Sequence, residues 1–427
     1  MFKNIVNAFK VKEVRIKIWL TLLLLLIYRV GCWLPVPGIN TSAFELGTSG
    51  SDFLTLLSSV SGGALSNGAI LALGVTPYIS SSIIIQLLTI AIPRLERLTK
   101  EGEEGKKKIA LYTKIAALIL AVAQAIGIVL SFGDSISTSL FGANTPIWIT
   151  SAFVVIMLTA GAMFTVWLGE KITELGIGNG LSLLIFVGIL STAGAGLLAA
   201  FKGISSDISQ LWNILIFVFA VIIIFGLIVF VDLAERRIPV QYAKQIKGRK
   251  MYGGQSTNIP IRVNGSGVMP IIFAMSLLAF PQLLMSIFWP NALAWYTTYL
   301  GTGSWAYSVV VAFLILFFAY FYNQITFNPD DISKQMQQNG GFIVGIRPGK
   351  PTADYLKKIS NRITLFGAIF LAFLALVPTL IFKAINVSSL INAFSATGMM
   401  IVVSVALEFD KQLEAQMLMR NYKGFLK

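Results

Sequence analysis

Long uncharged apolar runs alternate with short polar segments along nearly the whole chain, and this alternation sets the predicted structure. A helix needs about 20 mainly apolar residues to cross the roughly 30 Å hydrocarbon core of a bilayer, and ten runs approach or exceed that length. The expected spans are residues 16–34, 69–92, 109–132, 146–168, 179–200, 211–233, 267–289, 305–327, 363–382 and 388–408. The pattern predicts an all-α polytopic membrane protein with ten transmembrane helices.

Basic residues gather on one side of these ten spans. With the N-terminus inside, the inner segments hold 30 of the 33 lysines and arginines, and the exceptions are Arg29, Lys202 and Lys383. Lysine and arginine are retained preferentially in cytoplasmic loops, and a missed or extra span would scramble the asymmetry. We therefore expect both termini to be cytoplasmic. The first run lacks a small-residue cleavage site, so we expect a retained span rather than a signal peptide.

An even division of the ten spans predicts two domains. Five spans per half would force the halves into opposite orientations, which is typical of inverted repeats around a site near the midplane of the membrane. The expected halves are residues 1–200, with spans one to five, and residues 201–427, with spans six to ten. Because no residue-level repeat is clear, this division depends on parity alone.

The stretch Ser51 to Ile92 departs from the simple span pattern. Its first apolar run, Phe53 to Val60, would rise only about 12 Å as a helix, too little to cross a bilayer. Glycines and polar residues favouring turns follow, and an uncharged run long enough to span begins only at Ala69. Two interpretations remain open: a helix lying on the membrane surface, or a re-entrant plug near residues 52–67 that lines a cavity.

Composition narrows the function. The chain is 56% hydrophobic and 12% charged, with no histidine and one cysteine, Cys32. The commonest general base and metal ligand is therefore missing, and neither an intrachain disulfide nor a cysteine metal cluster can form. We expect no cofactor and no bond chemistry. A membrane-embedded hydrolase is disfavoured, because the spans also lack paired aspartates near the middle of the membrane.

Charged groups are almost absent from the middle of the spans. An ion-coupled transporter would be expected to keep such groups, each costing about 3 kcal/mol or more to insert, although ten spans would permit that class. Polarity comes instead from uncharged side chains, among them Gln86, Gln124 and Asn264. Each alone is explained by helix-to-helix hydrogen bonding. Together they indicate a wettable interior with an external energy source. A pore with such an interior would need a narrow apolar collar, which seals the channel against ions by excluding water.

Two inner loops, residues 234–266 and 328–361, are longer than orientation requires. The first contains two β-prone arms around the basic sequence KGRK, and predicts a hairpin. In the second, Gly345, Pro348 and Gly349 fix a turn that would display Arg347. Basic loops in most membrane proteins only set topology. Here they indicate a docking face for an acidic or anionic partner, either RNA or protein. The sequence GIGNG in the short loop 169–178 predicts a helix end followed by a helix start, rather than a phosphate loop.

Several motifs resemble one known family in the same order along nearly the whole chain. They are YRVGCWLPVPGIN, SGGALSNGAILALGVTPYISSSIIIQLLT, WLGEKITELGIGNGLSLLIF, ERRIPVQYAK, QSTNIPIRVNGSGVMPIIFA and GIRPGKPTADYLKKISNRIT. These runs are similar to the bacterial SecY family, the channel-forming subunits of the general secretory translocon. The resemblance implies a protein-conducting channel in the plasma membrane, which passes unfolded secretory chains and releases membrane helices sideways into lipid.

The resemblance also implies roles for individual residues. The plug would include Phe53, Leu54, Leu57, Gly62 and Gly63. The pore ring would be formed by Val75, Ile79, Leu181, Ile185, Ile272 and Ile401. The lateral gate would open between spans two and three and spans seven and eight, with polar contacts from Gln86, Gln124 and Asn264. Partners would dock on Arg249, Lys250 and Arg347.

The partners implied by the resemblance are the small subunits SecE and SecG, the motor ATPase SecA, the ribosome, preproteins bearing signal sequences, and membrane lipid. Three departures from the family pattern stand out. Val75 replaces the usual isoleucine, Val344 replaces a proline before the Arg347 turn, and the motif around Ile401 is the weakest match.

Overall fold

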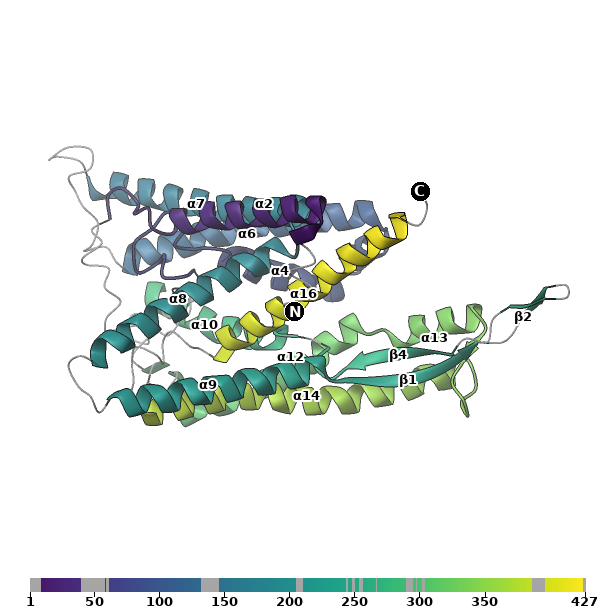
Figure 1. The fold of residues 1–427 in the computed structure, drawn as a ribbon. Helices are drawn as coiled ribbons and strands as arrows, with labels where there is room; N and C mark the ends of the chain where they lie inside the picture. Colours follow the sequence, from purple (N-terminus) through teal and green to yellow (C-terminus); the bar gives the residue numbers. More distant parts are fainter. Residues whose placement is uncertain are drawn as a thin grey trace. The chain divides into compact units, whose positions relative to one another are not determined.

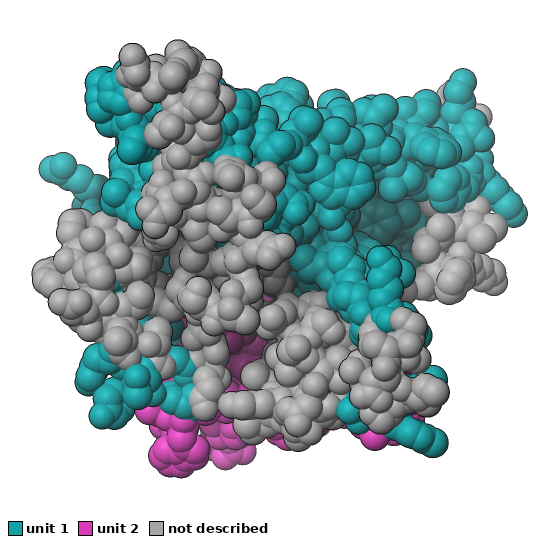
Figure 2. Space-filling view, turned by 90° about the vertical axis from the view of Figure 1, so that its left-hand side faces the viewer, with its two compact units in different colours: residues 1–214, 276–304, 386–427 teal, residues 215–275, 305–385 magenta. Residues whose placement is uncertain are grey.

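The computed structural model is mainly helical, and its helices are shown in Figure 1. It describes residues 9–39, 58, 61–131, 146–204, 210–242, 245–247, 250–252, 256–265, 267–288, 295–296, 298–301, 304–385 and 396–424. The chain folds into two compact units, coloured separately in Figure 2. Unit 1 comprises Met1–Ile214, Ser276–Ser304 and Asn386–Lys427; unit 2 comprises Leu215–Met275 and Trp305–Ile385.

Each of the ten predicted spans overlaps a helix in the described part of the chain. These helices are α2 (Lys12–Gly31), α4 (Thr76–Ala91), α6 (Glu103–Ser131), α7 (Ile147–Leu175), α8 (Gly180–Ile204), α9 (Gln210–Leu233), α10 (Met269–Phe288), α12 (Trp305–Thr326), α14 (Lys350–Ile385) and α16 (Ala396–Gly424). Helices α14 and α16 run well past their apolar runs into charged sequence. The fold class expected from the sequence is confirmed at the level of a helical protein with several membrane spans.

Among the described residues, six helices are long and apolar enough to cross a membrane. A seventh candidate is formed by α4 with the short helix α5 (Pro93–Lys100), which meet at a bend of 107°. The bend has a local cause. Pro93 disfavours helical dihedral angles at the residue before it, and Ile92 is extended, with φ −110° and ψ 113°.

The predicted start of the second span was wrong. Helix α4 begins at Thr76, and residues 69–75 form successive turns instead. Gly74 lies in the left-handed region at φ 53°, which a helix cannot include, and Pro77 lies in the first turn of the helix, where proline is favoured. With 16 residues, α4 rises only about 24 Å, less than the hydrocarbon thickness.

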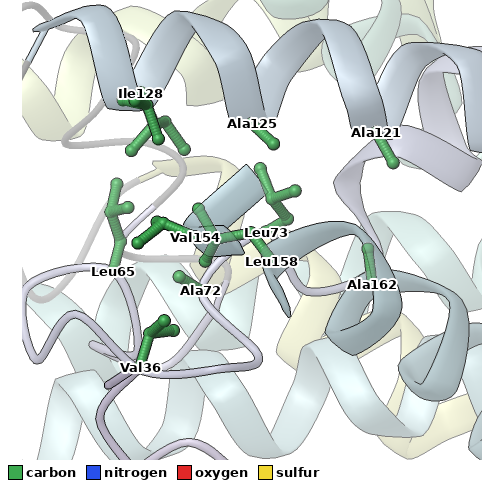
Figure 3. Packing of buried hydrophobic residues seen from close by; sticks show 11 residues of the cluster. Val36, Leu65, Ala72, Leu73, Ala121, Ala125, Ile128, Val154, Leu158 and Ala162 are labelled. Carbon is green, nitrogen blue, oxygen red and sulfur yellow. The ribbon is translucent and has the colours of Figure 1, made fainter. Parts of the chain in front are cut away.

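The core of unit 1 forms around this turn-rich stretch (Figure 3). Small residues Ala121 and Ala125 of α6 and Ala162 of α7 let the two helices approach each other closely. Leu65 and Leu73 of the non-helical stretch fill the space beside them. Irregular backbone is therefore buried among apolar helices.

The loop between α7 and α8 confirms the predicted helix end and start. Helix α7 ends at Leu175, Gly178 has φ 93°, and α8 begins at Gly180. The backbone N–H of Gly180 donates to Thr173 Oγ1 at 2.8 Å. Beside this loop, Ile177 packs with Leu413 of α16 and with Val14 and Ile18 of α2, so the loop is joined to two further helices of unit 1.

Unit 2 carries the predicted hairpin. Strands β1 (Glu235–Tyr242) and β4 (Ser256–Arg262) pair antiparallel, and β2 (Gln245–Lys247) pairs with β3 (Lys250–Tyr252) nearer the tip. A further strand, β5 (Gly341–Phe342), joins the other edge of β1, which the sequence did not predict. Helix α13 (Pro329–Gln338) and the start of α14 complete a small apolar core with this sheet.

The predicted halves, residues 1–200 and 201–427, describe a symmetry, which the grouping into compact units does not test. The units are instead groups of residues that pack together, and unit 1 contains residues from both predicted halves. The division into inverted halves stays a prediction.

Candidate functional site

The candidate site of unit 1 is built around the segment Ser61–Val75, which we call the inner segment. It contains no helix or strand beyond one bridge, yet eleven of its fifteen residues are buried. Its backbone bonds internally through turns, as in the bond from Ala69 N to Ala64 O at 2.9 Å. It also pairs with the chain after α2: Val36 N donates to Gly68 O at 2.8 Å, and Ile70 N to Leu34 O at 2.9 Å. Many polar groups of this buried, irregular backbone therefore have hydrogen-bond partners.

Glycines in three surrounding helices allow the inner segment to pack closely against them. A Cβ atom at Gly161 of α7 would lie 2.0 Å from the carbonyl oxygen of Ile70. A Cβ at Gly31 of α2 would lie 2.5 Å from Leu71 Cδ1. At Gly62 itself, a Cβ would lie 2.9 Å from the Cα of Gly188 in α8. The fit between segment and helices therefore has no room for side chains at these points.

The first residues of the inner segment are tied to the C-terminal end of α2. Arg29 Nη1 donates to the carbonyl oxygen of Gly62 at 2.8 Å, and the guanidinium lies 5.6 Å from the ring centroid of Trp33. The Cys32 thiol donates to Ser61 O at 3.7 Å. Sequence reasoning identified Arg29 and Cys32 but assigned neither a partner, because the contacts join residues about 30 positions apart.

The predicted plug is described in part. Phe53, Leu54 and Leu57 lie outside the described residues. Gly62 and Gly63 lie at the start of the inner segment, both in the left-handed region with φ 70° and 82°. That conformation strongly favours glycine, which explains the residue type at both positions. The functional role of these residues stays a prediction.

Five of the six predicted ring residues belong to unit 1, and Ile272 belongs to unit 2. Val75 and Ile79 are one turn apart at the start of α4, joined by the bond from Ile79 N to Val75 O at 3.1 Å. Leu181 and Ile185 are likewise one turn apart at the start of α8. Val75, Ile185 and Ile401 are buried. Helix α8, which carries two of these residues, packs against α7 and α16.

Leu181 has a contact of its own with α7. A Cβ at Gly169 would lie 2.5 Å from Leu181 Cδ2, so the leucine side chain lies directly on this glycine. Its neighbour one turn on, Ile185, lies three residues before Gly188, where the inner segment touches α8. The start of α8 thus contacts both α7 and the inner segment.

Of the predicted gate residues, Gln86 and Gln124 lie in unit 1. Gln124 of α6 is 9% exposed, and its Oε1 is a buried acceptor without a hydrogen-bond partner in the described part of the chain. Gln86 of α4 is half-buried, and its carbonyl accepts a bond from Thr89 Oγ1 at 2.7 Å. An unsatisfied buried acceptor is costly, so this side chain needs an explanation.

Asn264, the third predicted gate residue, lies in unit 2 and has a fixed amide orientation. Its Nδ2 donates to Asp232 Oδ1 at 2.6 Å. Because a carboxylate can only accept, the amide oxygen of Asn264 must face away from Asp232. That oxygen is buried and has no hydrogen-bond partner among the described residues. Gln124 and Asn264 therefore each present an acceptor.

An ion pair that the sequence did not predict joins α6 to α7. Lys114 Nζ lies 2.7 Å from Glu170 Oε1 and 2.8 Å from Oε2, and both side chains are half-buried. Nearby on α4, Ser81 Oγ donates to the carbonyl oxygen of Thr113 at 3.0 Å. These bonds connect α4, α6 and α7 toward the side predicted to be cytoplasmic.

Two of the predicted docking residues are described. Arg347 is exposed, at the turn that runs from Gly345 (φ 84°) to Gly349 (φ 96°). Its carbonyl oxygen accepts a bond from Thr352 Oγ1 at 2.8 Å, which ties the turn to α14. Lys250 begins β3 and pairs with Lys247, whereas Arg249 lies outside the described residues. Among the described residues, no group of three or more acidic, cysteine or histidine side chains could hold a metal ion.

Comparison with known proteins gives one consistent family. The SecY family model matches residues 69–409. The protein translocase subunit SecY of Streptomyces scabiei is 42% identical over 443 residues, covering 100% of both chains. The SecY subunit of Mycobacterium tuberculosis is 41% identical over 458 residues, again covering 100% of both.

Solved structures give the same fold. A structure described as that of a protein-conducting channel is similar with a TM-score of 0.64 and 20% identity, covering 94% of this chain and 92% of the other. A SecY structure concerned with the plug domain and the closed state has a TM-score of 0.62 and 20% identity, over the same shares. Sec61 in a canine ribosome-channel complex has a TM-score of 0.59 and 19% identity, again over 94% and 92%.

Proposed function

This chain belongs to the SecY family of protein translocase subunits, and from that premise we propose how its parts form and control a protein-conducting channel. It is a multi-pass membrane protein. Unfolded secretory chains are its cargo, and apolar helices leave it sideways into lipid. The chain itself provides the path, and a bound motor or ribosome provides the energy.

The observation that carries this proposal is the inner segment. Eleven of the fifteen residues from Ser61 to Val75 are buried, although the segment is built of turns, and helices apolar enough to span a membrane surround it. Non-helical backbone at membrane depth is tolerated only where protein buries it or where it lines a cavity. The first part of this segment, Ser61–Asn67, can leave its position without unfolding a span, which is what a plug requires. Residues near 52–67 form that plug in the proposal.

The collar of the resting channel consists of Val75, Ile79, Leu181, Ile185, Ile272 and Ile401. Branched aliphatic side chains exclude water from a narrow passage and offer no hydrogen bonds to a passing chain. Support comes from the helical spacing of the two pairs in α4 and α8, and from the contact of the inner segment with Gly188 near Ile185.

The lateral gate uses Gln86, Gln124 and Asn264. The buried, unpartnered oxygens of Gln124 and Asn264 support this assignment, because such groups are retained only at a cost. In the proposal, these oxygens make polar contacts across the gate between spans two and three and spans seven and eight. An apolar signal helix breaks these contacts when it passes into lipid.

The cytoplasmic face docks the partners. The exposed Arg347 turn and the β2–β3 tip with Arg249 and Lys250 meet the motor SecA or the ribosome. SecE and SecG are the small subunits. The sidedness of the basic residues supports a bacterial plasma membrane location with both termini cytoplasmic.

Site-specific crosslinking tests the proposed path. A photoreactive residue at Ile185 should crosslink to a preprotein stalled in transit. The same residue at Leu190, an exposed position farther along α8, serves as the matched control and should crosslink to lipid. Equal crosslinking of cargo at both positions would contradict the assignment of Ile185 to the collar.

A further inference from the structure

We propose that Arg29 is a positioning residue that holds the inner segment in place in the resting channel. The proposal deepens the proposed function, since it assumes that the chain around Gly62 moves with the plug. Arg29 would act as a latch: its bond to Gly62 is made in the closed state and broken when cargo displaces the segment.

The latch contact is specific. Arg29 Nη1 donates to the carbonyl oxygen of Gly62 at 2.8 Å, a charge-assisted bond across 33 positions in sequence. Gly62 is held from both sides, because a Cβ there would lie 2.8 Å from Arg29 Nη1 and 2.9 Å from the Cα of Gly188. The backbone at Gly62 is therefore clamped between α2 and α8, so a loss of Arg29 opens one side of the clamp.

The charge of Arg29 needs a local reason. It is one of three basic residues outside the segments predicted to be cytoplasmic, and the positive-inside bias disfavours lysine and arginine there. Its guanidinium is half-buried beside Trp33. A cation at a membrane helix end is retained where it has partners such as backbone carbonyls and aromatic rings. The Gly62 carbonyl is the partner that would be lost when the segment leaves, so the closed state gains most from Arg29.

Cys32 reports on the same contact. It is the only cysteine of the chain, it is 0% exposed, and its Sγ lies 3.7 Å from the carbonyl oxygen of Ser61, next to Gly62. Movement of the inner segment away from α2 would uncover this thiol. The rate at which the Cys32 thiol is alkylated therefore measures how often the inner segment moves away from α2.

The experiment compares maleimide labelling of Cys32 in the full chain, reconstituted in liposomes with its small subunits. The wild type, Arg29→Leu and Arg29→Lys are labelled in parallel, with Cys32→Ser for background. Lys202→Leu removes the same charge from the same predicted side, and serves as the matched control. Hydrogen bonds to charged groups are worth enough that Arg29→Leu should label about ten- to a hundredfold faster than the wild type.

A second measurement separates a latch from a merely structural role. If Arg29 is a latch, its loss lowers the free energy needed to open the channel. Arg29→Leu should therefore raise the resting ion conductance, and it should translocate a preprotein with a weakened signal sequence better than the wild type. A structural defect would lower translocation instead, and would overturn the proposal. Arg29→Lys keeps the charge without the planar donor group, and should label at an intermediate rate.

Wild-type labelling rates in both Arg29 variants would also overturn the proposal. If the wild type translocates no preprotein, the proposed function fails. The labelling comparison would still decide whether Arg29 holds the segment.

Discussion

A methyl group added at Gly161 should test the packing of the inner segment directly. A Cβ built at this position lies 2.0 Å from the carbonyl oxygen of Ile70 and 2.8 Å from its carbonyl carbon. Real Cβ atoms essentially never approach another heavy atom closer than 3.0 Å, so the backbone at Ile70 must recede from α7 by at least about 1 Å in Gly161→Ala. Backbone yields less readily than a flexible side chain, so the strain should reach the whole inner segment.

The expected cost follows from overpacking. Adding a single carbon to a well-packed site typically costs about 1–3 kcal/mol. The matched control is Gly194→Ala in α8, where a Cβ would meet nothing within 4 Å. Alanine is the better helix former by roughly 0.5–1 kcal/mol, so Gly194→Ala should keep or raise the stability of the protein.

The assay is a denaturant titration of both purified variants in detergent, followed by resting ion conductance in liposomes. Gly161→Ala should unfold at lower denaturant than the wild type, and its resting conductance should rise because the segment is displaced. If Gly161→Ala is as stable and as tight as Gly194→Ala, the close contact between Ile70 and α7 does not exist, and the description of the inner segment would have to be abandoned.

Three further predictions concern the collar, the gate and the docking face. Ile185→Asn or Ile79→Asn should wet the collar and raise resting conductance in planar bilayers; an unchanged leak would remove that residue from the seal. Asn264→Asp should place two carboxylates at the 2.6 Å contact with Asp232 and destabilise the protein by about 3 kcal/mol or more in denaturant titration, and adding Asp232→Asn should restore most of that loss; no recovery in the double variant would refute a direct pair. Arg347→Glu should slow motor-driven translocation while membrane abundance, measured by immunoblot, stays normal; wild-type rates would leave Arg347 with a role in topology alone.

Hydrophobic pattern predicted the helices well because it acts locally. Each of the ten apolar runs overlaps a helix, since a run of that length in a membrane has few alternatives to helix. The hairpin of β1 and β4 was also predictable, because alternating β-prone residues and turn signals lie close together in sequence. The start of α4 was predicted wrongly, at Ala69 instead of Thr76. Apolar composition alone does not reveal that residues 69–75 are buried as turns.

The candidate site was less predictable, because its contacts join distant positions. The polarity of the spans identified Asn264 and the family resemblance gave it a gate role, but nothing in the sequence indicated that Asp232, 32 residues earlier, fixes its amide. The bond from Arg29 to Gly62 and the ion pair of Lys114 with Glu170 depend on helix packing in the same way. Residue types can be predicted from local rules, whereas their partners require the tertiary structure.

The central claim is that this chain forms a motor-driven path for unfolded proteins. The most direct measurement reconstitutes it with SecE and SecG into liposomes, adds SecA, ATP and a preprotein bearing a signal sequence, and then applies protease from outside. We expect full-length preprotein to be protected, and the protection to disappear without ATP. An unprotected preprotein, in liposomes where SecA binding has been confirmed, would contradict the claim.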